Sequence, residues 1–125
     1  MAQSIAADIK TVGMGTRVIS GSFVNNGTTL TGARGKGWTA VRTSAGLITV
    51  TLGQNYNSLI CGDAQVNPAS PPAKWAAQVS QDLTTYNTFT ITTYDGSSGS
   101  PSAADSGSTD RVSFMVVLST SSVNK

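Results

Sequence analysis

The side chains that most often perform acid–base and nucleophilic catalysis are scarce in this 125-residue chain, which contains neither histidine nor glutamate. A Ser-His-Asp or Cys-His site therefore cannot be built. A serine activated by a lysine is compatible with the composition, but the spacing of the serines and lysines selects no such pair. We expect that the chain is not an enzyme and that it uses no cofactor.

Metal ligands are equally scarce. With Cys61 as the only cysteine and with no histidine, zinc binding is not expected. Asp95, Asp105 and Asp110 lie in one polar segment, but the alternating acidic ligands and closing glutamate of a calcium loop are absent. We therefore predict no metal site and assign these aspartates to keeping a polar loop in solvent. Cys61 follows apolar residues, so we expect a buried and inert thiol.

The segment 32–38, GARGKGW, places Arg34 and Lys36 between glycines and directly before Trp38. It matches no phosphate-loop pattern, and it lacks the additional aromatic residues that would stack successive bases. One interpretation is a Gly-rich turn that leads into a strand with Trp38 in the core; the other is a protein-contact loop. Trp75 has the same two interpretations, core residue or interface anchor.

The net charge of +2 gives no basic stripe, although the sequence pI is about 8.9. Binding to nucleic acid or to a membrane surface is therefore not indicated. Residues 1–12 include charged side chains and no long apolar run, and the longest apolar run, 114–118, is too short to cross a bilayer. A single cysteine fits a reducing compartment.

Composition and periodicity favour β-structure. The chain has 17 serines, 17 threonines and 13 glycines, and it is poor in the residues that favour helices. The clearest pattern is a hairpin, in which 38–43 and 47–52 both alternate with period two around a turn at 44–46. Further strands are predicted at 17–24, 58–61, 88–94 and 111–118, and 75–83 is compatible with a strand or a two-turn helix, the strand being favoured.

Two strands carry more specific expectations. Gly21 interrupts the first strand, which predicts a bulge or a close approach to the backbone. The last strand is apolar on both faces, which predicts a central position with burial on both sides. We predict an all-β fold: a single antiparallel β-sandwich or barrel, jelly-roll-like, of seven or eight short strands. Residues 1–15 form an N-terminal arm, 16–120 the β domain with a long polar loop at 95–110, and 121–125 a tail.

Several of these segments, taken together, resemble small structural proteins on the heads of tailed bacteriophages. The resemblance rests on residues 21–24, 32–38, 41–43, 46–52, 89–94 and 112–119, and on the polar loop that carries Asp105. The proteins in question are decoration (cement) proteins or short head fibres, which are β-rich and commonly trimeric.

This resemblance implies a virion protein on the capsid exterior, assembled in the host cytoplasm, with the major capsid protein as partner and a homotrimer as its own assembly. The implied capsid or subunit contacts are Met1, Ile5, Ile9, Lys10, Arg17, Arg34, Lys36 and Trp75. A different function is also compatible with the sequence: a carbohydrate- or receptor-binding module of a phage fibre, with Trp38, Trp75 or Tyr94 as a stacking platform.

Overall fold

The computed structural model describes residues 16–53, 56, 58–69, 75–81, 87–96 and 102–119. The predicted arm at 1–15 and tail at 121–125 lie outside these residues. The strands are β1 (Thr16–Asn25), β2 (Leu30–Arg34), β3 (Trp38–Ser44), β4 (Leu47–Leu52), β5 (Ser58–Asn67), β6 (Trp75–Gln81), β7 (Thr88–Asp95), β8 (Ser102–Ala103) and β9 (Arg111–Ser119).

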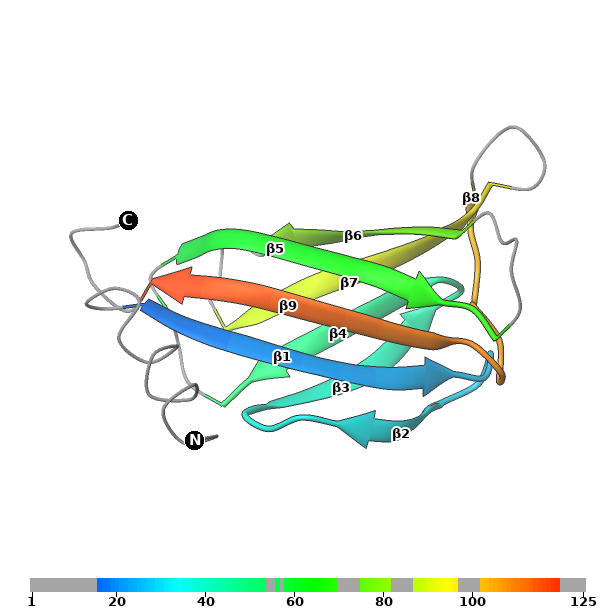
Figure 1. Cartoon of the computed structure of the whole chain (residues 1–125), viewed down its shortest axis with the longest axis horizontal. Helices are drawn as coiled ribbons and strands as arrows, with labels where there is room; N and C mark the ends of the chain where they lie inside the picture. Colours follow the sequence, from blue (N-terminus) through cyan, green and yellow to red (C-terminus); the bar gives the residue numbers. More distant parts are fainter. Residues whose placement is uncertain are drawn as a thin grey trace.

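The strands form two antiparallel sheets that pack face to face (Figure 1). The first sheet has the order β2-β1-β9-β5; the second has the order β3-β4-β7-β6, with β8 paired to β7. The predicted all-β sandwich is thus confirmed. The described residues contain two strands that the pattern did not predict, β2 and β8, because β2 is exposed along most of its length and β8 has only two residues. Neither strand shows the alternation of apolar and polar residues that marks a half-buried strand.

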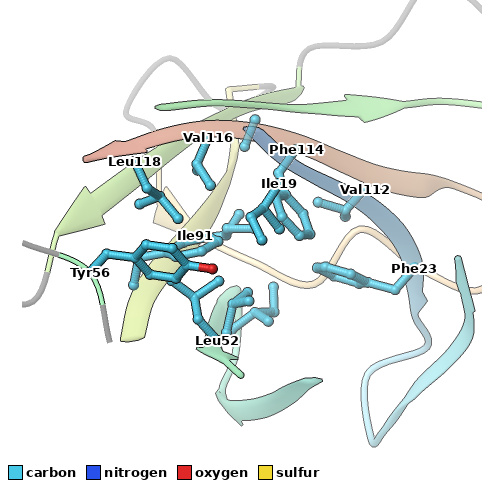
Figure 2. Close-up of a cluster of buried hydrophobic side chains, with 13 residues drawn as sticks. Ile19, Phe23, Leu52, Tyr56, Ile91, Val112, Phe114, Val116 and Leu118 are labelled. Atoms are coloured by element: carbon cyan, nitrogen blue, oxygen red, sulfur yellow. The ribbon is translucent and has the colours of Figure 1, made fainter. Parts of the chain in front are cut away.

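The core lies between the sheets and is built by alternate residues of the central strands. In the predicted hairpin, Ile48, Val50 and Leu52 of β4 are buried, and the residues between them are only partly buried. Figure 2 shows these layers meeting, with side chains from both sheets pointing toward one another. The core residues are Ile19, Phe23, Ile48, Val50, Leu52, Tyr56, Ala64, Phe89, Ile91, Val112, Phe114, Val116 and Leu118.

Three expectations about individual strands have clear outcomes. Residues 75–81 form a strand, as favoured. The last strand is central, as predicted, but the prediction that both of its faces are buried is wrong. Met115 is 53% exposed, because a two-layer sandwich leaves the outer face of each sheet in solvent. The prediction that the Cys61 thiol is buried is also wrong. Cys61 is exposed, since a register shift between Leu59 and Cys61 places the thiol opposite the outward-facing Val117.

Gly21 provides the predicted close approach. A methyl group added there would overlap the indole ring of Trp38. The ring packs edge-on against Phe114 at a centroid distance of 5.1 Å, and its Nε1–H donates to the carbonyl oxygen of Ser20 at 3.2 Å. The interpretation of Trp38 as a residue packed on the core is therefore confirmed, and the missing side chain at Gly21 makes room for it.

We predict that Gly21→Ala lowers the free energy of unfolding by about 1–3 kcal/mol, because the new methyl group displaces the indole ring. Urea denaturation measures the change. Gly53→Ala is the matched control: its added methyl group would lie 3.7 Å from the carbonyl oxygen of Gly37, an ordinary contact, and should change stability by less than about 1 kcal/mol. In a Trp38→Leu background the cost of Gly21→Ala should disappear, and an equal cost in both backgrounds would contradict this account.

Candidate functional site

Two of the predicted contact residues come together at the end of the sandwich where β1 begins. Arg17, near the start of β1, and Lys36, in the turn between β2 and β3, line one cavity of about 370 Å³. Val18, Ile19, Gly37, Gly53 and Tyr56 line the rest of it. The cavity combines two cationic side chains with apolar surface, so it suits a partner that offers an acidic group beside an apolar one.

The turn that carries Lys36 is held firmly against β1. Gly35 and Gly37 have φ angles of 118° and 88°, a region that side chains other than glycine rarely adopt. A methyl group at Gly35 would also come within 2.5 Å of the carbonyl oxygen of Ser20, and the N–H of Gly53 donates to the carbonyl oxygen of Gly37 at 3.0 Å. The exposed Lys36 is thus presented from a fixed backbone.

The other predicted contact residues do not join this cavity. Arg34 is exposed on β2, opposite Ser22, and is not part of the cavity lining. Trp75 is half-buried at the start of β6, at the side of the second sheet. Met1, Ile5, Ile9 and Lys10 lie outside the described residues.

The aromatic residues considered for a carbohydrate platform are not gathered on one surface. Trp38 packs against the core, as described above. Trp75 is opposite Asp95 in the β6–β7 register, and Tyr94 is opposite Ala76. Because consecutive residues of a strand point to opposite faces, Trp75 and Tyr94 lie on different faces of the second sheet.

The densest set of polar contacts surrounds Asp105, which sequence reasoning did not single out for such a role. Its carboxylate accepts hydrogen bonds from Arg42 Nε at 3.0 Å and Nη2 at 2.8 Å, from the N–H of Gly46 at 2.9 Å, and from Asn25 Nδ2 at 2.8 Å. Asn25 ends β1 in the first sheet, whereas Arg42 and Gly46 belong to the β3–β4 hairpin of the second. Asp105 therefore ties the two sheets together at the end opposite the Arg17–Lys36 cavity. We call these four residues the Asp105 clamp.

Residues 104–110 of the predicted polar loop are held by hydrogen bonds to other elements. The N–H of Ala104 donates to the carbonyl oxygen of Thr93 at 3.0 Å, and the N–H of Gly107 donates to that of Asn25 at 3.0 Å. Asp110 accepts a hydrogen bond from the N–H of Ala69 at 2.9 Å. The assignment of Asp105 and Asp110 to solubility alone is wrong, because both carboxylates satisfy backbone donors from other elements.

The clamp also determines the charge state of its members. The hydrogen bonds from Arg42 lower the pKa of Asp105 to about 2, with further contributions from the Gly46 N–H and the Asn25 amide against the opposing effect of burial. The same hydrogen bond raises the pKa of Arg42. The pair is a bidentate arginine–carboxylate contact, the strongest geometry of its kind.

Neither a cluster of metal ligands in the described residues nor a similarity to a known protein indicates a function for this chain. Within the described residues, no three His, Cys, Asp or Glu side chains come together as metal ligands. The described part of the chain also has no helix of the length and apolar character needed to cross a membrane. Comparisons with protein-family models, curated proteins and solved structures find no match to this chain.

We predict that the free energy of unfolding falls by about 1–2 kcal/mol through Asp105 as the pH is lowered from about 5 to about 2. The pKa of Asp105 is about 2 in the folded protein and about 3.9 in the unfolded chain. The stabilisation that Asp105 provides is therefore complete at pH values above the pKa of the unfolded chain, and it is lost as the pH falls through the pKa of the folded protein. Chemical denaturation across this range measures the effect.

Asp105→Asn should remove this part of the pH dependence and lower stability at pH 7. The matched control is Asp63→Asn, at an exposed aspartate on β5 outside the clamp, which should keep the wild-type dependence. If Asp105→Asn retained the full loss of stability at low pH, the Asp105 clamp would not be the source of that loss.

Proposed function

We propose that this chain is a structural virion protein of a tailed bacteriophage, a decoration (cement) protein that binds the outer capsid surface and stabilises the head lattice. The observation that supports it best is the meeting of Arg17 and Lys36 in one cavity at the end where β1 begins. Residues 1–15 lead into β1 at this same end. The basic cavity would bind an acidic patch of the major capsid protein, and residues 1–15, which precede β1 in the sequence, would supply further contacts.

The outer faces of the sandwich suit a lattice-binding role. On the second sheet, Thr39, Thr51 and Thr88 are aligned across three neighbouring strands. Such hydroxyl groups form hydrogen bonds with a partner without the cost of removing charges from water. A decoration protein gains its affinity from many modest contacts and from several copies bound to one lattice, so it needs no active site.

The remaining elements of the proposal follow from the resemblance described above. Met1, Ile5, Ile9 and Lys10 would contact the capsid from residues 1–15, and Arg34 would add a cation beside the cavity. The protein would act on the exterior of the virion after assembly in the host cytoplasm. The homotrimer and an interface role for Trp75 stay predictions.

The fibre-module alternative has less support. It needs aromatic rings on one accessible surface, whereas Trp38 packs on the core and Trp75 and Tyr94 lie on different faces of their sheet.

We predict that the double variant Arg17→Gln/Lys36→Gln loses at least tenfold in affinity for expanded heads of the phage that encodes the chain, because the cavity loses both cations. Co-sedimentation with heads lacking the protein measures binding. The matched control is Gln65→Glu/Gln78→Glu, which changes the net charge by the same amount on exposed strand positions away from the cavity. Equal losses for both variants would point to net charge alone and would contradict a localised site.

Deleting residues 1–15 should abolish co-sedimentation while leaving the melting temperature of the β domain within a few degrees of the full chain. The reason is that the deletion removes a contact segment and leaves all nine described strands in place. Circular dichroism verifies the fold. Undiminished binding of the shortened chain would remove residues 1–15 from the capsid contact.

A further inference from the structure

The edge strands of the two sheets differ in how well they are protected from pairing with another chain. β5 and β6, which form one edge of each sheet, lie side by side: a methyl group at Gly62 would be 3.1 Å from Val79 Cγ1. β2 forms the other edge of the first sheet and is five residues long, with a positive φ at Gly32 and a register shift against β1. Short strands, irregular backbone and cover by another strand are the usual protections of a sheet edge.

β3, the remaining edge, has fewer of these protections: its register is irregular only near its end, between Arg42 and Ser44. It is seven residues long, contains no proline or lysine, and pairs in regular register with β4 from Trp38 to Arg42. Its one charged side chain, Arg42, is already paired with Asp105. Val41, in the middle of the strand, is 59% exposed, the highest value among the large hydrophobic residues of the described chain. An edge of this kind favours strand addition.

A second copy of the chain fits this edge by its own sequence. In an antiparallel pair centred on Val41, this valine lies opposite Val41 of the second copy, within the part of β3 that pairs regularly with β4. The valine–valine pair packs two β-branched side chains against each other across the strands. Arg42 lies opposite Ala40 in this register, so no like charges face each other. Two-fold symmetry supplies every contact away from the axis twice.

We propose that two copies associate through β3, with the strands antiparallel and centred on Val41, so that the second sheets of both copies become one continuous sheet. The contact is made by β3 and uses neither Arg17 nor Lys36. It therefore does not rest on the proposed capsid function. It differs from the threefold assembly that the resemblance implies, because a contact of a strand with its own copy has two-fold symmetry.

A seven-residue edge buries less area than a standard interface, so the dimer forms reversibly with concentration. Sedimentation velocity of the wild-type chain from micromolar to millimolar concentration should show a rise from the 12.8 kDa monomer to twice that mass. Val41→Lys should raise the dissociation constant at least tenfold, whereas Met115→Lys, at a similarly exposed position on the outer face of the first sheet, should leave it unchanged. A monomer at all concentrations, a trimer, or a dimer insensitive to Val41→Lys would overturn the proposal.

Cysteine cross-linking tests the register. In a Cys61→Ser background, which removes the exposed native thiol, Val41→Cys should give a covalent dimer on mild oxidation. Thr39→Cys alone should give little covalent dimer, because in this register Thr39 does not face Thr39 of the second copy. Equal yields from Val41→Cys and Thr39→Cys alone would overturn pairing centred on Val41.

Discussion

The carboxylate of Asp105 holds together the parts of this sandwich that the hydrophobic core does not reach. The core fills the space between the sheets, but at one end the last residue of β1 and the β3–β4 turn meet polar groups that need partners. Asp105 accepts hydrogen bonds from the buried Asn25 and from Gly46, and it neutralises Arg42. The only cysteine cannot form a disulfide within the chain, so this polar contact complements the core as a link between the sheets.

The cationic side chains of the described residues include some that bind within the fold and some that are exposed to a partner. Arg42 is used by Asp105, and Arg111 donates to Ser22 Oγ at 2.8 Å and to the carbonyl oxygen of Gly32 at 2.9 Å, so both guanidinium groups serve the fold. Lys36, at the opposite end, projects from a turn whose backbone is fixed by glycine conformations and by the packing of Trp38. The two ends of the sandwich thus have different roles: the Asp105 end stabilises the fold, and the opposite end presents a basic cavity. The β3 edge belongs to neither end, because it runs along the side of the second sheet.

The extent to which sequence predicts this arrangement depends on the range of each interaction. Alternation of neighbouring residues identified the 38–52 hairpin, because local periodicity reports directly on burial. The pattern at 75–83 fitted a strand and a helix, and only the β character of the other elements favoured the strand. Exposure of Cys61 depends on a bulge, and exposure of Met115 depends on the number of layers, neither of which is encoded in the neighbouring residues. The Asp105 clamp joins residues from distant parts of the chain, so no local pattern marks it. Likewise, Arg17 and Lys36 were singled out as cations, but only the fold places them in one cavity.

Electron cryomicroscopy of expanded heads incubated with the purified protein tests the proposed function most directly. The account predicts density at repeated lattice positions on the outer surface of the shell, with each sandwich oriented so that the Arg17–Lys36 cavity faces the capsid and the Asp105 end points outward. Shells that stay bare at saturating protein concentration, or density confined to fibres, would contradict it.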